Sequence, residues 1–151
     1  MLEKLKRIIE YCQIINAGLP VPAPHIVADE SQGTTVLNNP TIEGQQVIIS
    51  IPLAKLSGNI DSMTGPHAFI IYALEKAPAM TATQCNVIGQ YLTTLNLLKM
   101  ILEKIASDIG GQGTPEGCPL LAGMELNEIE VLPVAGLFGG WNGYSAAVTL
   151  K

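Results

Sequence analysis

Apolar residues recur every three or four positions in residues 2–16, and charged side chains lie between them. This spacing is typical of an amphipathic helix. Gly18 and the prolines of "LPVPAP" come next, and neither continues a helix. We therefore expect one short helix near the start of the chain.

A second helical pattern covers residues 81–109 and is the longest element that the sequence predicts. Its apolar stripe consists of Ile88, Leu92, Leu95, Leu98, Leu102, Ile105 and Ile109. Thr81 or Thr83 is suited to cap its first turn, and Gly110 and Gly111 are suited to end it. A helix of roughly 27 residues is about 40 Å long, which exceeds the width of a small sheet. We therefore expect one end of it to reach a neighbouring subunit.

Alternating apolar positions predict strands between and after the two helices. We expect short extended pieces or strands at residues 25–29, 34–37, 45–54, 67–75, 127–134 and 141–150. The clearest of them is the third, in which Val47, Ile49, Ile51 and Leu53 share one face. The strand at 127–134 alternates glutamates with apolar residues, so we expect it to be half exposed.

The order of these elements fits the α+β class, with a mainly antiparallel sheet packed against one long helix and a shorter N-terminal helix. A chain of 151 residues has the size of one domain. We therefore expect a single domain over residues 1–151. The turn-rich segment 57–66 is expected to be a flexible loop or a contact with another subunit.

The composition favours a homo-oligomer. Charged residues make up 14% of the chain, whereas a typical soluble domain has about 25%. A surface rich in neutral side chains costs little to desolvate against another subunit. A monomer with an uncharged surface is the alternative.

The net charge of −5 is unevenly distributed. Residues 105–150 contain no lysine or arginine, and their acidic residues are Asp108, Glu116, Glu125, Glu128 and Glu130. Such a region repels a phosphate backbone, so sequence-specific binding of nucleic acid is not expected. Lys4, Lys6 and Arg7 are interpreted as the solvated face of the first helix.

The sequence carries no pattern of a catalytic, metal or cofactor site. Cys12, Cys85 and Cys118 lie far apart and form no CxxC pair, which argues against a disulfide framework and a zinc site. His25 and His67 lie on separate segments, without the spacing of metal ligands. No serine lies in a GxSxG motif. We therefore expect no enzyme activity, no metal and no cofactor.

The N-terminal residues "MLEKLKRIIE" place charges among their apolar positions, unlike a secretory signal. No apolar run approaches the ~20 residues of a membrane span. We expect synthesis in a reducing cytoplasm and no membrane partner.

The stretch "GLFGGWNG" is the strongest candidate for a special site, because it sets the single tryptophan among glycines. A phosphate-binding glycine loop opens a helix, whereas a strand is expected to follow here. We therefore interpret the stretch as a turn or bulge between two strands, with Trp141 as an anchor. Of the two surfaces that Trp141 could contact, its own sheet or a partner subunit, we favour the partner.

The acidic strand "LNEIEVLPV", the glycine hinge and the terminal "GGWNGYSAAVTLK" resemble the end of small head–tail joining proteins of tailed bacteriophages, of the tail-terminator and neck-ring type. The order of the preceding elements is also similar. The resemblance implies a homo-oligomeric ring in the virion. Its partners would be copies of itself, neighbouring neck or tail-tube proteins, and DNA that passes through the lumen without specific binding.

We nominate as interface residues Ile60, Met63, Phe138, Trp141 and Tyr144. Two alternatives stay open. One is a small α+β ligand-binding domain or enzyme with a pocket beside Trp141, His67 and Tyr72. The other is a different tail or baseplate component.

Overall fold

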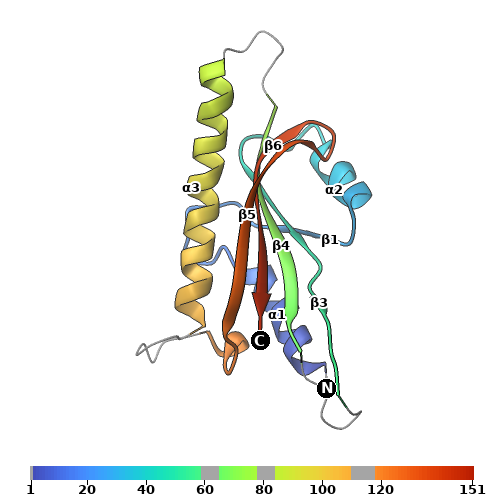
Figure 1. The fold of residues 1–151 in the computed structure, drawn as a ribbon. Helices are drawn as coiled ribbons and strands as arrows, with labels where there is room; N and C mark the ends of the chain where they lie inside the picture. Colours follow the sequence, from blue (N-terminus) through green and yellow to red (C-terminus); the bar gives the residue numbers. More distant parts are fainter. Residues whose placement is uncertain (1, 59–64, 78–83, 110–117) are drawn as a thin grey trace.

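The computed structural model describes residues 2–58, 65–77, 84–109 and 118–151. Its helices are α1 (Glu3–Ile14), α2 (Glu30–Leu37), α3 (Gln84–Asp108) and the short 3₁₀ helix η1 (Pro119–Leu121). Its strands are β1 (His25–Val27), β2 (Gln46–Ser50), β3 (Leu53–Ala54), β4 (His67–Lys76), β5 (Leu126–Leu137) and β6 (Trp141–Leu150). Figure 1 shows the long α3 running beside β5. The α+β class, the long helix and the N-terminal helix are confirmed.

The described strands form one mostly antiparallel sheet in the order β1-β2-β4-β6-β5, with β3 also paired to β4. Among the described strands, β1 and β2 are the one parallel pair. β4 and β6 pair along their whole length, from His67 opposite Leu150 to Lys76 opposite Trp141. β5 therefore forms one edge of the sheet, and the short β1 forms the other.

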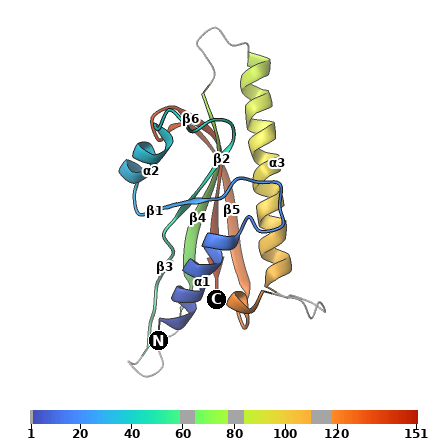
Figure 2. The ribbon, with the colours of Figure 1, turned by 180° about the vertical axis from the view of Figure 1, so that it is seen from behind.

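The two faces of the sheet carry separate apolar cores. On one face, α1 and α3 cover β2, β4 and β6, and buried members of this core include Ile8, Ile49, Ile71, Leu98 and Val148. On the other face, a smaller core lies under α2. Figure 2 shows α2 and α3 on opposite sides of the sheet. Because successive side chains of a strand point to opposite faces of the sheet, the strands contribute residues to both cores.

A buried polar contact joins the C-terminal end of α3 to α1. The Tyr11 hydroxyl donates a hydrogen bond of 2.6 Å to Asp108 Oδ2, and Lys104 Nζ lies 2.9 Å from the same oxygen. Tyr11 is 1% exposed, and burial, with the hydrogen bond to Asp108 second, raises its pKa far above the ordinary value. Tyr11 therefore stays neutral at neutral pH and can donate its hydroxyl proton to Asp108.

Replacing Tyr11 with phenylalanine should lower the free energy of unfolding by about 1.5 to 3 kcal/mol, because a buried hydrogen bond to a charged acceptor is lost. Urea unfolding at neutral pH measures this. Lys99→Met is the matched control, because Lys99 and Glu103 form an exposed pair, 68% and 66% exposed, which should contribute less than about 1 kcal/mol. Equal stability of Tyr11→Phe and the unmodified protein would contradict the importance of this contact.

Two strand predictions need correction. Residues 34–37 belong to α2, whose first turn is capped by Asp29 accepting from Gln32 N at 2.8 Å. The hydroxyls of Thr34 and Thr35 bond to carbonyls one turn earlier, so residues with a preference for strands are held in a helix. The predicted strand 45–54 ends at Ser50 and resumes as β3. Pro52 lies between the two pieces and has no N–H for a ladder hydrogen bond.

The apolar stripe predicted for the long helix is only partly a core stripe. Leu98 and Ile105 are fully buried, whereas Ile88, Leu92 and Leu95 are exposed. In the N-terminal half of α3, polar residues take buried positions: Gln90 donates a hydrogen bond to Lys76 O of β4, and Thr94 is fully buried. The predicted caps Thr81, Thr83, Gly110 and Gly111 lie outside the described residues.

Candidate functional site

The glycine-rich stretch is the turn between β5 and β6. Phe138, Gly139 and Gly140 have φ values of 50°, 83° and 117°, so three consecutive residues lie in the left-handed region. The turn is tied to β4 by Ala77 N, which donates to Gly140 O at 2.7 Å. The turn interpretation is therefore confirmed, and Trp141 is the first residue of β6.

Trp141 lies inside the subunit. Its side chain is 2% exposed and belongs to the core under α2, where it packs with Leu37, Ile48 and Leu74. Almost none of its surface is left for a partner, so the expectation that it contacts another subunit is corrected. The sequence pattern cannot separate the two cases, because residues 34–37 favour a strand and the helix that covers the indole is not apparent from it.

Phe138 is also buried, at 3% exposure, and so offers no interface surface either. Its ring lies against α2 at Gly33, where an added Cβ would come within 2.4 Å of it. It also meets Tyr72 edge to face, with ring centroids 5.3 Å apart. Phe138, whose backbone is in the left-handed region, thus packs the β5–β6 turn against α2. The absence of a side chain at Gly33 leaves space for the Phe138 ring.

Tyr144 lies on the opposite face of the sheet and is half buried. Its ring meets Tyr91 of α3 edge to face at 5.9 Å, and the Tyr91 hydroxyl donates to Val134 O of β5 at 3.2 Å. Tyr144 therefore helps to seat α3 on the sheet. The remaining interface nominees, Ile60 and Met63, and most of the loop 57–66 lie outside the described residues.

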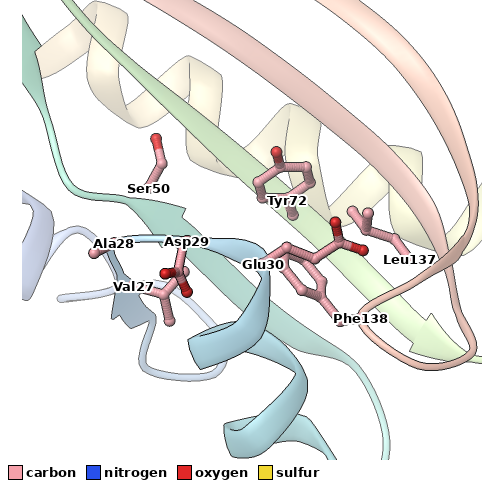
Figure 3. Close-up of a pocket in the computed structure, with 8 residues that line it drawn as sticks. All are labelled: Val27, Ala28, Asp29, Glu30, Ser50, Tyr72, Leu137 and Phe138. Atoms are coloured by element: carbon pink, nitrogen blue, oxygen red, sulfur yellow. The ribbon is translucent and has the colours of Figure 1, made fainter.

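A small cavity of about 180 Å³ opens beside the β5–β6 turn. Figure 3 shows its lining: Val27, Ala28, Asp29, Glu30, Ser50, Tyr72, Leu137 and Phe138. Burial, and then the nearby Glu30 carboxylate, raises the pKa of Tyr72, so its hydroxyl is neutral and can donate. Two carboxylates beside aromatic rings could accept a small cation such as an ammonium group. No sequence pattern indicates this cavity, because it forms where α2 begins.

The lining of this cavity does not form a nucleophile and base pair. The Ser50 hydroxyl oxygen accepts a hydrogen bond from Ile70 N at 2.8 Å, and no histidine is among the described residues that line the cavity. These residues could therefore bind a cation, but they do not form a catalytic group for acyl or phosphoryl transfer.

The pocket imagined beside Trp141, His67 and Tyr72 is not assembled. His67 opens β4 opposite Leu150, and Trp141 lies opposite the other end of β4. Nine residue steps along a strand separate the two ends by about 30 Å. Of the three residues, only Tyr72 lines the cavity beside the β5–β6 turn.

His67 is nevertheless unusual. It is 3% exposed, and its Nε2 atom has no hydrogen-bond partner in the described part of the chain. Burial, and then the nearby positive charge of Lys4, lowers its pKa below 6.5. The unfolded chain therefore binds a proton at His67 more readily than the folded chain does, which makes the fold less stable as the pH falls below about 6.5.

We expect the free energy of unfolding to decrease between about pH 7.5 and about pH 5, and His67→Leu to remove part of that decrease. Urea unfolding at several pH values measures it. His25→Gln is the control, because His25 is only half buried and its Nε2 atom lies 3.2 Å from Gln46 Oε1. An unchanged pH dependence in His67→Leu would contradict the burial of a neutral His67.

Within the described ranges, no group of three or more histidine, cysteine or acidic side chains is placed to hold a metal ion. Cys12 and Cys118 are free thiols, and burial raises the pKa of Cys12 to about 12. The thiol of Cys12 is therefore neutral and part of the core. None of the helices in the described part of the chain has the length and apolar character needed to cross a bilayer.

No protein-family model matches the chain, and no curated protein is similar enough in sequence to be counted as a relative.

Proposed function

We propose that the protein is a structural virion subunit that assembles with copies of itself into a ring at the head–tail junction of a tailed bacteriophage, as a tail terminator or neck protein. The main support for self-assembly is the exposure of apolar side chains on the outward face of α3. There Ile88, Leu92 and Leu95 are 51%, 63% and 37% exposed. Grouped apolar side chains on the surface mark an interaction site.

The charge of this region supports a neutral protein partner. No charged residue occurs from Gln84 to Leu98, the first fifteen residues of α3. A helix surface without ions costs less free energy to remove from water than a charged one does. Contact with another protein surface removes the apolar side chains from water.

The acidic β5 edge supports the assignment to a DNA passage. Glu125, just before β5, and Glu128 and Glu130 within it are exposed. Acidic side chains on the wall of a channel would repel phosphates and let DNA slide without being held. This supports a ring through which DNA passes, and it does not separate the head–tail junction from another ring of the tail.

Native mass spectrometry and negative-stain electron microscopy of the purified protein test the ring. We expect one closed oligomer with a central channel. A protein that stays monomeric at on the order of 100 μM, where contacts with micromolar Kd are formed, would contradict the proposal. Labelling of the subunit in phage particles separates the sites: label at the neck is expected, and label at the far end of the tail would favour the baseplate alternative.

The cavity beside the β5–β6 turn favours one other function, a small ligand-binding domain for a cationic group. A thermal shift with a primary amine, lost in Glu30→Gln, would support it. We propose no catalytic role for either function.

A further inference from the structure

A second cavity, of about 410 Å³, lies where α2 ends, and small-molecule sites have volumes of about 300 to 1,000 Å³. The cavity in Figure 3 lies where α2 begins, and the two share none of their described lining residues. The walls of the second cavity come from the turn after α2 and from the paired ends of β4 and β6, where Lys76 lies opposite Trp141. Figure 1 shows α2 beside this end of the sheet. We call it the α2-end cavity.

The floor of the α2-end cavity is apolar. Leu37 and Trp141 are 3% and 2% exposed, and Ile42 packs against the same core. The indole of Trp141 also has one hydrogen-bond donor, its N–H, and a buried tryptophan usually has an acceptor for this group. None of the described residues accepts from it, and it is not one of their solvent-excluded polar atoms. The N–H is therefore open to an acceptor in the cavity.

Two opposite charges border the α2-end cavity, Lys76 from β4 and Glu43 from the turn after α2. Both residues are exposed, and neither takes part in the ion pairs formed among the described residues. The last carbonyl groups of α2 add partial negative charge, and no basic residue lies in its last turn to offset it. The cavity therefore has a positive group on its sheet wall and negative groups on its helix and turn walls.

We propose that the α2-end cavity binds a free α-amino acid with an apolar side chain. The charges select a zwitterion, because a ligand with a single charge meets a like charge here. Glu43 and the end of α2 repel an anion, and Lys76 repels a cation. This inference goes beyond the proposed ring and does not depend on it.

Each part of such a ligand has a counterpart in the cavity. The carboxylate accepts hydrogen bonds from the Lys76 ammonium group and from the Trp141 indole N–H, and the ligand's ammonium group donates to Glu43. The apolar side chain lies on the floor formed by Leu37, Ile42 and Trp141, which removes it from water. A hydrocarbon without charges leaves both ions and the indole N–H without a partner.

Binding of L-leucine tests the proposal. Equilibrium dialysis of the purified protein against labelled L-leucine measures binding, and the fluorescence of Trp141, the only tryptophan, locates it. We expect saturation with a Kd on the order of 1 mM or below, as for a ligand of about nine non-hydrogen atoms. The indole emission should change over the same range of concentration.

Two analogues of leucine test the need for both charges. 4-Methylpentanoate lacks the amine, and 3-methylbutylamine lacks the carboxylate. Each should be at least about 10-fold less effective than unlabelled leucine in displacing the label, because a hydrogen bond between charged groups is lost. Competition for labelled leucine reports on this cavity alone, so an amine bound in the cavity of Figure 3 does not disturb the result.

Lys76→Met and Glu43→Gln each remove one charge from the cavity. Both should weaken leucine binding by roughly 5-fold, the upper end for an exposed ion pair. They should keep the thermal unfolding midpoint, because both residues are exposed. Lys99→Met is the matched control: it removes an exposed lysine of α3 that is not among the residues lining the cavity, so it should bind leucine as the unmodified protein does.

Three results would overturn the proposal. The first is the absence of saturable binding at on the order of 10 mM leucine, where contacts with a Kd of about 1 mM are formed. The second is displacement of the label by either analogue as effectively as by leucine. The third is leucine binding that stays unchanged in both Lys76→Met and Glu43→Gln, which would put the ligand elsewhere on the protein.

Discussion

Trp141→Ala should lower the free energy of unfolding by roughly 3 to 5 kcal/mol, the range for removing a large buried aromatic side chain. The indole is 2% exposed and fills the core between α2 and the sheet, against Leu37, Ile48 and Leu74. Its removal leaves a cavity that the paired strands β4 and β6 cannot close by shifting. Urea unfolding followed by far-ultraviolet circular dichroism measures the change without using the lost fluorophore.

Leu132→Ala is the matched control, because Leu132 is 51% exposed and its truncation should cost less than about 1 kcal/mol. Trp141 is the only tryptophan, so fluorescence reports on it alone. Emission should be that of a buried indole both in the assembled protein and after dilution to a concentration at which the assembly dissociates. A shift to the emission of a water-exposed indole on dissociation would mean that a partner, and not the subunit's own core, covers Trp141.

The sequence was sufficient for the elements whose periodicity reflects burial. α1, β4 and β6 were predicted close to their observed bounds, because their apolar residues face a core at regular spacing. The α+β class followed from their order. The 34–37 segment was missed because Thr34, Thr35 and Val36 favour strands in isolation, whereas the Asp29 cap and hydroxyl contacts to earlier carbonyls hold them in α2.

The surface of α3 shows what hydrophobic periodicity does not predict, namely which residues of an apolar stripe are buried. Ile88 and Leu98 fall on one sequence stripe, yet Leu98 is fully buried and Ile88 is 51% exposed. A stripe records which residues share a side of a helix, and it does not tell whether the same subunit covers that side. The cavity near Tyr72 was hidden for a related reason, since it exists only where α2 and the β5–β6 turn meet.

The glycines of "GGWNG" look equivalent in the sequence, but the structure gives them different roles. Gly140 has φ of +117° and no atom within 4 Å of an added Cβ, so only backbone conformation requires glycine there. At Gly143 an added Cβ would lie 2.0 Å from Ala73 O and 3.0 Å from its carbonyl carbon. The obstacle at Gly143 is therefore the backbone of β4, the strand paired with β6 along its whole length.

Gly143→Ala should consequently destabilise the fold by about 3 kcal/mol or more, because relief requires the paired strands to move apart in the centre of the sheet. Gly140→Ala should cost only about 1 to 2 kcal/mol, the strain of a non-glycine residue in the left-handed region. Both values come from urea unfolding of the two variants side by side. If Gly140→Ala proved the more damaging of the two, β6 could not approach β4 as closely as Gly143 requires, and the turn rather than the strand contact would set the stability of this end of the sheet.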